Sequence, residues 1–306
     1  MHYSLAQNNW QPEQVHKLSA LLACQDIRLV TKQGGGNSVV YCIEAAGRKW
    51  AVKSYPPYAP GQRDRLAAEV MVYQFLNQHG IPSVPTLNTY SESERWLVMD
   101  WIEGEVPQHY GTSDIEQAVK FIQSISRLNT LPNAKKLPLA AEACLSLTIL
   151  LDQIRQRFER LQAITDEHVL QRFLSDEFEP VLVRCHDLAM AGYHEAGIDP
   201  DSALPQEKRS LIPADFGFHN TIRDRSGKLY FFDFDYFGWD DPVKLLADVL
   251  WHPKMQLSDQ QKQTFIRGFS GAYAHDAQFL SRFRYTWSLF GLRWVLILLN
   301  EFIPAF

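Results

Sequence analysis

The spacing of apolar residues changes part of the way along this chain of 306 residues. In the first hundred or so residues the apolar positions form short β-type runs with a few helical turns, whereas nearly everything after Ser113 has the three-and-four spacing of helices. Strands gathered at one end and helices at the other are typical of an α+β fold. We therefore predict two lobes: residues 1–102, with an antiparallel sheet and a crossing helix, and residues 103–306, larger and mainly helical.

Runs rich in β-branched and aromatic residues predict the strands of the first lobe. They cover residues 27–30, 39–43, 49–53 and 95–101. A helical stretch opens at Pro12, ahead of the first strand. A second helix is predicted over residues 65–79, because Leu66, Val70 and Tyr73 recur at helical spacing and Gly80 follows as a stop signal.

The second lobe is predicted to consist of helices over residues 115–128, 145–161, 169–193, 242–251, 265–273 and 279–302. Asp241 before Pro242 is typical of an N-cap followed by proline at the first helical position. Ser258 and Gln261 have the spacing of a capping box. The most apolar stretch, residues 287–299, contains Arg293 and is too short to cross a bilayer, so we interpret it as part of a buried helix.

Charge and cysteine content limit the partners and the compartment. Lys and Arg number 30 against 35 Asp and Glu, and no stretch gathers the basic residues into a stripe that could follow a phosphate backbone. We expect no nucleic-acid partner and, without an export signal or a membrane span, no membrane partner. Four widely spaced cysteines without a CxxC pair favour the reducing cytoplasm. The sequence carries no signal for the oligomeric state.

A glycine-rich segment lies between the first two predicted strands and consists of Gly34, Gly35, Gly36, Asn37 and Ser38. Without β-carbons its backbone N–H groups can approach an anion closely, so the segment could cover a phosphate. A flexible turn is the alternative interpretation, and the spacing of a Walker loop is absent.

Lys53 lies on the second strand after this segment. Because strand side chains alternate between faces, Ala51 shares the face of Lys53. The small Ala51 would leave room for a flat base, and the Lys53 ammonium would reach phosphates as a point charge. Glu69, on the following helix, is the natural ion-pair partner. The alternative for Lys53 is a solvated strand lysine.

The strongest local signal for chemistry begins at Asp215 and continues into a predicted hairpin over residues 221–233 with a turn at residues 224–227. Pairing Arg223 with Lys228 across this turn would set Asn220 opposite Phe231. In that register Asn220 would end near Asp233, at the base of the hairpin.

An amide and a carboxylate projecting from one hairpin offer the oxygen ligands that Mg²⁺ takes beside substrate phosphates. Asn220 and Asp233 could hold the ion in this way. Asp215 would then orient a hydroxyl and accept its proton during phosphoryl transfer. Turn capping is the alternative for any one of these residues, but not for all of them in this order.

Together these motifs resemble the aminoglycoside phosphotransferase and choline kinase-like family, which has a protein kinase-like fold, over essentially the whole chain. The resemblance is carried by the glycine-rich hairpin, residues 51–53, Glu69, residues 97–105, residues 215–220 and residues 232–235. It implies ATP and Mg²⁺ as cofactors, Asp215 as catalytic base and Asn220 and Asp233 as metal ligands. It also implies that Lys53, paired with Glu69, contacts the α- and β-phosphates.

The same resemblance implies that adenine meets backbone groups of Met99, Asp100 and Trp101. Asp248 matches a family position that usually braces the active-site loops, so we predict a structural role for it. The position of Asp235 tolerates several residues in the family.

One departure is that the family commonly has His-Gly immediately before the catalytic aspartate. In this chain Pro213 and Ala214 precede Asp215. We expect the change to affect local bracing of the loop more than its chemistry, so an active enzyme is favoured over a degenerate one.

The acceptor is left open by the sequence. Aromatic residues that could cage a quaternary ammonium by cation–π attraction are Tyr236, Trp239, Trp251, Tyr285, Trp287 and Trp294, but helical spacing favours core packing for them. Glu301 could bind a cationic or hydroxylated acceptor, but an exposed helix glutamate is the favoured interpretation. We predict an ATP-dependent kinase that acts on a hydroxyl of a small molecule such as an aminoglycoside, amino alcohol or sugar. The alternatives are a nucleotide-binding pseudokinase with a regulatory or scaffold role, and an α+β protein whose resemblance is only architectural.

Overall fold

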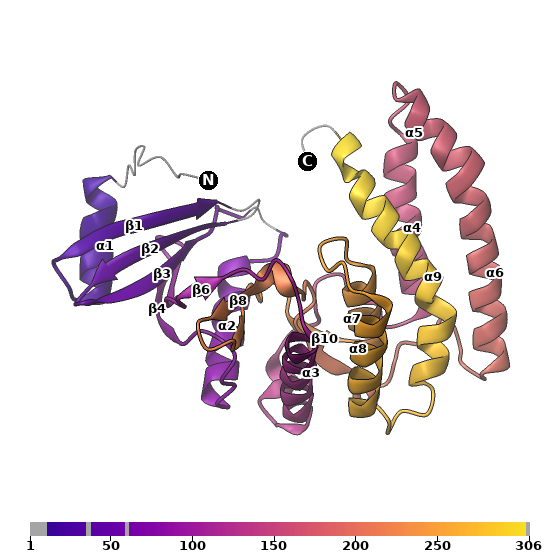
Figure 1. Cartoon of the computed structure of the whole chain (residues 1–306). Coiled ribbons are helices and arrows are strands. Elements are labelled where there is room, and N and C mark those ends of the chain that lie inside the picture. Colours follow the sequence, from indigo (N-terminus) through magenta and orange to yellow (C-terminus); the bar gives the residue numbers. More distant parts are fainter. Residues whose placement is uncertain (1–10, 35–37, 59–60, 304–306) are drawn as a thin grey trace. The chain divides into compact units, whose positions relative to one another are not determined.

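The computed structural model describes residues 11–34, 38–58 and 61–303 (Figure 1). It contains two compact units. The first unit comprises residues 1–107 and 220–237, and the second comprises residues 108–219 and 238–306. Each unit is therefore built from two separate stretches of sequence. This division concerns compactness, and the lobe boundary between residues 102 and 103 stays a prediction.

A five-stranded antiparallel sheet in the order β1-β2-β3-β5-β4 forms the first unit. Its strands are β1 (Ile27–Gly34), β2 (Val39–Ala45), β3 (Arg48–Ser54), β4 (Leu87–Ser91) and β5 (Trp96–Asp100). Ala46 and Gly47 join β2 to β3 with positive φ angles of 52° and 72°, as a two-residue type I′ turn requires. The four predicted strands are confirmed. β4 was not predicted, because polar residues interrupt its β-type pattern.

The alternation of strand side chains gives this sheet two different faces. On one face α1 (Pro12–Leu22) packs through Leu18, which is buried in a cluster with Val52. The other face carries α2 (Arg65–Gln78), which lies close to β4 and β5. Lys53 follows Val52 in β3 and so points toward α2.

Residues 220–237 add a hairpin to the first unit. It forms a three-stranded sheet in the order β6-β8-β9, with β6 (Gly104–Glu105), β8 (Thr221–Asp224) and β9 (Leu229–Phe231). Close contact with β8 explains the glycine in β6, since a β-carbon on Gly104 would lie 2.2 Å from the Arg223 carbonyl oxygen.

The predicted register of this hairpin is wrong by one residue. Arg223 lies opposite Leu229 rather than Lys228. The turn is the physical reason: the Asp224 N–H donates to the Lys228 carbonyl across a three-residue loop, in which Gly227 takes the left-handed φ of 85°. A loop one residue longer than a two-residue turn shifts every pair that follows it.

The second unit is mainly helical. Its helices are α3 (Thr112–Ser126), α4 (Leu147–Gln162), α5 (His168–Arg172), α6 (Glu179–Glu195), α7 (Pro242–Trp251), α8 (Asp259–Ala272) and α9 (Phe279–Leu298). α9 packs against α4, α6 and α7, and α3 packs against α8. A small antiparallel pair of strands, β7 (Ser210–Ile212) and β10 (Gly238–Asp240), completes the unit.

The apolar spacing and capping residues in the sequence predicted most of these helices correctly. The Asp241 side chain accepts a hydrogen bond from the Val243 N–H at 2.9 Å, and Ser258 forms the predicted capping box with Gln261. The helix predicted over residues 169–193 is interrupted, because a π-helical turn over Phe173–Phe178 separates α5 from α6. Among the helices that the structure describes, none is both long and apolar enough to span a membrane.

Candidate active site

A buried lysine lies at the centre of the polar cluster in the first unit. β3 directs Lys53 toward α2, where its Nζ lies 2.6 Å from Glu69 Oε2, so the predicted ion pair is present. The same ammonium lies 2.7 Å from Asp233 Oδ1. Burial alone would lower the pKa of Lys53, but the Glu69 and Asp233 carboxylates outweigh it and hold that pKa above its ordinary value. Lys53 therefore stays a cation.

Glu69 is fully buried and held on both carboxylate oxygens. The Tyr55 hydroxyl donates to Oε2, and the Phe234 N–H donates to Oε1 at 3.1 Å. These contacts fix the Glu69 side chain, which in turn fixes the position of Lys53. The helical face predicted for Glu69 is confirmed, since it faces the sheet from α2.

Asp233 and Asn220 close the base of the hairpin. The Phe232 N–H donates to the Asn220 carbonyl at 3.2 Å, so Asn220 lies opposite Phe232, the residue before Asp233. Asp233 has a left-handed backbone conformation with φ of 68°, which aspartate tolerates better than most residues do. Its side chain is 37% exposed. The pair offers one amide oxygen and one carboxylate, a donor set of hard oxygens that fits Mg²⁺.

Asp235 lies beside this cluster and is buried. Its Oδ2 lies 3.2 Å from Arg65 Nη1 at the start of α2. Burial, and then the carboxylates of Asp233 and Glu69, raise the pKa of Asp235 to about 7. The Arg65 contact links the hairpin to α2, which gives Asp235 a structural role within the unit.

The predicted phosphate-covering segment is only partly described. Gly34 ends β1 opposite Val39 in β2, so the two strands form the predicted hairpin, with Ser38 just before β2. Gly35, Gly36 and Asn37 lie outside the described residues. At Gly34 a β-carbon would meet open space, so packing does not explain that glycine.

The predicted adenine-binding segment lies where β5 ends. Met99 pairs with Ala51 across β5 and β3, and both side chains are buried. The Asp100 N–H donates to the Thr86 carbonyl at 3.0 Å, and the Asp100 carboxylate accepts from Arg48 at 2.6 Å. Trp101 follows directly. Their contacts with a nucleotide stay predictions.

Asp215 belongs to the second unit, in the loop after β7. Two buried phenylalanines anchor this loop: Phe216 stacks on Phe121 with ring centroids 5.8 Å apart, and Phe218 stacks on Tyr110 at 4.2 Å. Ala214, just before Asp215, has a left-handed φ of 54°. Asp215 directly precedes the first of these phenylalanines, and 41% of its side chain is exposed.

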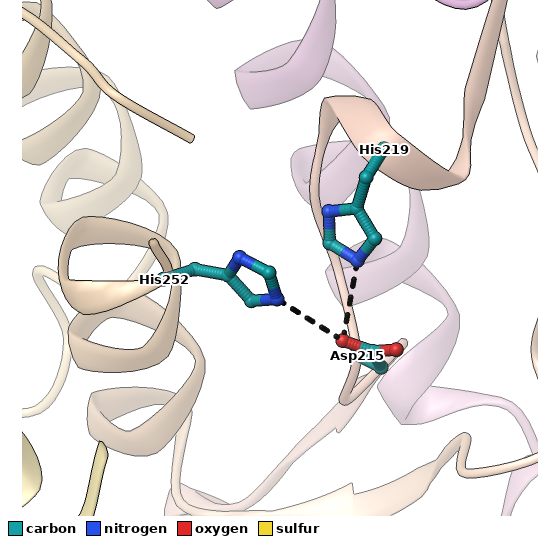
Figure 2. A group of neighbouring side chains, drawn as sticks. All are labelled: Asp215, His219 and His252. Carbon is teal, nitrogen blue, oxygen red and sulfur yellow. Dashed lines mark hydrogen bonds and ion pairs between the residues drawn. The ribbon is translucent and has the colours of Figure 1, made fainter. Parts of the chain in front are cut away.

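Two histidines converge on Asp215, and neither was assigned a role from the sequence (Figure 2). His219 Nε2 lies 3.4 Å and His252 Nε2 lies 3.7 Å from Asp215 Oδ1. The two imidazole rings stack with centroids 4.2 Å apart at an angle of 18°. A side chain at Gly217 would displace His219, since a β-carbon there would lie 2.6 Å from His219 Nδ1. His252 comes from the end of α7, so only the tertiary fold brings it to the loop.

The buried state of His252 predicts a pH dependence of stability. Burial, and then the neighbouring His219, lower the pKa of His252 to about 4 from 6.5. Between these values the unfolded chain binds a proton at this histidine that the folded chain does not, so the contribution of His252 to stability falls as the pH falls from about 6.5 toward 4. We expect a loss of about 2 kcal/mol over this window, allowing for residual solvation of the ring.

Urea unfolding of the wild type and of His252→Gln across this pH window measures the effect. The variant lacks the titrating group, so its stability is expected to fall less steeply with acid than that of the wild type. Parallel slopes for the two proteins would contradict a depressed pKa at His252.

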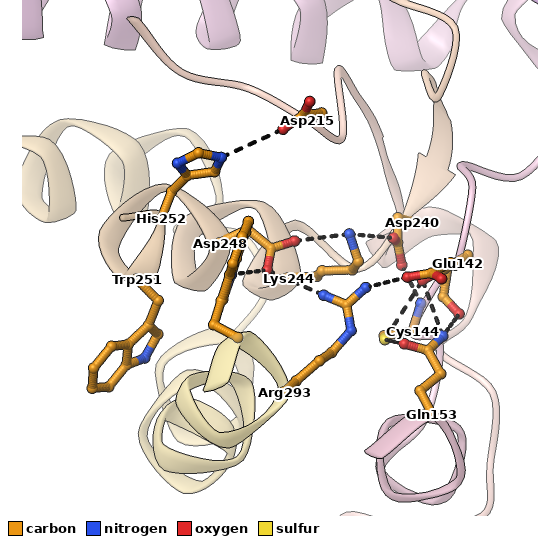
Figure 3. A network of polar contacts seen from close by, with 12 residues as sticks. Glu142, Cys144, Gln153, Asp215, Asp240, Lys244, Asp248, Trp251, His252 and Arg293 are labelled. Carbon is orange, nitrogen blue, oxygen red and sulfur yellow. Dashed lines mark hydrogen bonds and ion pairs between the residues drawn. The ribbon is translucent and has the colours of Figure 1, made fainter. Parts of the chain in front are cut away.

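Asp248 lies at the centre of a buried ion network between α7 and α9 (Figure 3). Its carboxylate lies 2.9 Å from Lys244 Nζ and 3.3 Å from Arg293 Nη1, and it accepts from the Trp294 indole at 2.9 Å. The His252 N–H donates to the Asp248 carbonyl at 2.8 Å. The network therefore joins α9 to the end of α7 that carries His252, in agreement with the structural role predicted for Asp248.

The aromatic residues considered for a cation cage instead have packing partners. Trp251 stacks on Trp287 with centroids 4.5 Å apart and donates to its carbonyl. The Trp239 indole donates to the Ala134 carbonyl. Tyr236 belongs to the first unit, where it stacks under Arg65. Glu301 is exposed in the 3₁₀ turn after α9. The packing interpretation is thus the better supported one.

Comparisons with known proteins assign the chain to a family. The sequence matches the phosphotransferase enzyme family over residues 29–279. No curated protein matches the chain significantly. A spectinomycin phosphotransferase solved with ADP and spectinomycin has a TM-score of 0.65 at 14% identity, over 97% of this chain and 89% of that one.

Two further structures are similar. An aminoglycoside phosphotransferase in a ternary complex with streptomycin and ATP has a TM-score of 0.59 at 17% identity, over 98% of this chain and 92% of that one. A choline kinase from Streptococcus pneumoniae has a TM-score of 0.58 at 14% identity, over 94% and 89% of the two chains.

The family match covers most of the chain, so this protein belongs to the phosphotransferase enzyme family. The predicted α+β, protein kinase-like fold is confirmed, and it is the fold of small-molecule kinases. Because the similar structures share less than a fifth of their residues with this chain, they support the fold, and the roles of individual residues stay predictions.

Proposed function

We propose that the protein is an ATP-dependent kinase that transfers the γ-phosphate to a hydroxyl group of a small molecule. The observation that carries this proposal is the buried Lys53 ammonium held between Glu69 and Asp233. A cation fixed beside a candidate metal-ligand carboxylate suits the phosphates of a nucleotide. The family match includes all three residues and supports the same reaction class.

In the proposed mechanism Lys53 binds the α- and β-phosphates, and Glu69 keeps its ammonium in place. Asn220 and Asp233 would hold Mg²⁺, which when bound offsets the charge of the phosphates. Asp215 orients the acceptor hydroxyl and takes its proton. As it does so, the bond from the hydroxyl oxygen to the γ-phosphorus forms and the bond from that phosphorus to the leaving oxygen of ADP breaks.

We further propose that residues 1–102 bind the nucleotide and that residues 103–306 carry the catalytic base and the acceptor site. Residues 34–38 would cover the phosphates, and the backbone of residues 99–101 would contact adenine beside Ala51. The acceptor is an aminoglycoside, an amino alcohol or a sugar-like molecule, classes that include the substrates named for similar enzymes. The four cysteines are all free thiols, which suits a reducing cytoplasm.

Mg²⁺-dependent ATP binding should be weaker in Asp233→Asn than in the wild type. Asparagine tolerates the left-handed backbone at this position but removes the charge. We expect the Mg²⁺-dependent affinity for ATP to fall at least about tenfold. Loss of a residue that only supports a metal ligand already lowers metal affinity by about that factor, and Asp233 is proposed as a ligand itself. Isothermal titration calorimetry with and without Mg²⁺ measures this.

Asp224→Asn is the matched control, because it makes the same change in the exposed turn of the same hairpin, where Asp224 Oδ1 accepts from the Ser226 and Lys228 N–H groups. Equal losses in the two variants would contradict a specific role of Asp233.

A screen for acceptor-dependent ADP release across aminoglycosides, amino alcohols, sugars and nucleosides identifies the acceptor, with Asp215→Ala as the inactive control. ADP release that depends on one class and is absent from Asp215→Ala would support the kinase. ATP binding without ADP release for any class would favour a nucleotide-binding pseudokinase. This is the second candidate function because Pro213 and Ala214 stand where the family usually has His-Gly.

A further inference from the structure

The group around Asp215 contains more than the proposed base. His219 and His252 come from two different segments, the loop itself and the end of α7, yet both direct Nε2 at the same oxygen, Asp215 Oδ1 (Figure 2). Their side chains are only 13% and 9% exposed, whereas that of Asp215 is 41% exposed. Two mostly buried rings thus hold one face of a solvent-facing carboxylate.

The hydrogen bonds of His252 decide which of its nitrogens carries the proton. The Lys254 N–H donates to His252 Nδ1 at 3.1 Å, so Nδ1 is an acceptor. The charged and titratable groups that act on this ring are Asp215, His219, Lys254 and Asp248, and burial lowers its pKa to about 4. The ring is therefore neutral near pH 7, with its single proton on Nε2, which faces Asp215.

The surroundings of His219 lead to the same tautomer. Its Nδ1 is buried without a hydrogen-bond partner, whereas its Nε2 lies 3.4 Å from Asp215 Oδ1. In its neutral form an imidazole carries its proton on the nitrogen that faces a hydrogen-bond acceptor, because a buried N–H group without a partner is costly. Both rings then present an N–H group to one carboxylate oxygen, and their parallel stacking keeps them in that arrangement.

The same three side chains are close enough to bind a metal ion, but their hydrogen bonds oppose it. A histidine that binds a metal through Nε2 carries its proton on Nδ1 and donates it to an acceptor. On His252 that proton would face the Lys254 N–H, and on His219 it would be buried without an acceptor. An arrangement in which both Nε2–H groups face Asp215 is therefore favoured over a metal centre.

We propose that His219 and His252 are positioning residues that orient the Asp215 carboxylate by directing their Nε2–H groups at Oδ1, His219 through a hydrogen bond at 3.4 Å and His252 through a longer electrostatic contact at 3.7 Å. This inference rests on the proposed function, in which Asp215 takes the proton of the acceptor. In this role neither imidazole takes the proton of the acceptor. Their loss would let the carboxylate rotate, which lowers the rate of the chemical step while leaving the nucleotide site intact.

Paired substitutions test the kinetic consequence. Gln can place an amide N–H where the Nε2–H group lies, whereas Leu of similar size cannot. We expect His252→Leu and His219→Leu to lower kcat by about 10- to 100-fold with little change in KM for ATP, and the matching Gln variants to recover most of the loss. Equal losses in Leu and Gln variants would overturn the proposal in favour of packing alone. His194→Leu, on the exposed face of α6, is the control.

A second measurement is independent of any acceptor. Long-range ¹H–¹⁵N correlation spectra report the tautomer of each imidazole, and the two Gln variants assign the signals. We expect the Nε2–H tautomer for both rings near pH 7. An Nδ1–H tautomer, or Zn²⁺ shifting the two rings together at stoichiometric amounts, would overturn the proposal. If the tautomers are as expected but the wild type releases no ADP with any acceptor, the proposed function fails and the arrangement of the three side chains stands.

Discussion

Asp215→Asn is expected to lower kcat for acceptor-dependent ADP release by about 10²- to 10⁴-fold, the range of a lost general base. Asparagine keeps the shape of aspartate, and its amide oxygen can still accept from the His219 N–H group and face that of His252. It cannot take a proton from the acceptor hydroxyl. The effect should therefore fall on the chemical step, with the affinity for ATP in the presence of Mg²⁺ unchanged.

Steady-state kinetics and calorimetry on the same preparations separate these effects. The matched control is Asp166→Asn, which makes the same change at an exposed position of the second unit. A kcat within about threefold of the wild type in Asp215→Asn would mean that another group, or no group, takes the proton.

Asp248→Ala is expected to destabilise the protein by about 3 to 5 kcal/mol, the cost of breaking a buried ion pair by removing one partner. The substitution leaves the Lys244 ammonium, the Arg293 guanidinium and the Trp294 indole without their shared acceptor in a buried region. Arg293 keeps its contact with Glu142, at 2.6 Å, so one of its two carboxylate partners remains. The apparent Tm should fall by roughly 10 °C.

Thermal unfolding followed by circular dichroism measures this shift. Asp152→Ala is the matched control, because Asp152 forms a comparable ion pair with Arg155, at 2.7 Å, on the solvent-exposed side of α4. We expect that control to change stability by less than about 1 kcal/mol. Similar shifts for the two variants would mean that the buried network contributes little beyond a surface ion pair.

The sequence predicted features that depend on local periodicity. The alternation of β3 placed Lys53 on the face opposite Val52, and the three-and-four spacing of α2 placed Glu69 toward it, so their ion pair could be foreseen. The N-cap at Asp241 followed from residue type alone. Each of these follows from rules that act over one turn of helix or along one strand.

Features that depend on tertiary contacts or on small differences in turn geometry could not be predicted from local sequence patterns. The hairpin register required knowing that Gly227 adopts a left-handed conformation in a three-residue loop. The π-helical turn over Phe173–Phe178 has no distinct residue pattern. The convergence of His219 and His252 on Asp215 depends on where α7 ends in space, and no spacing in the sequence encodes it.

Both proposed acids are presented by backbone that most residues avoid. Ala214, which precedes Asp215, and Asp233 itself have φ angles of 54° and 68°. A β-branched or bulky residue at either position would meet the steric cost of that conformation. Position 214 is thus restricted by its backbone conformation, and position 233 by its backbone conformation and, in the proposed mechanism, by charge, so a bulkier side chain at position 214 is expected to displace the neighbouring Asp215 carboxylate without touching a substrate.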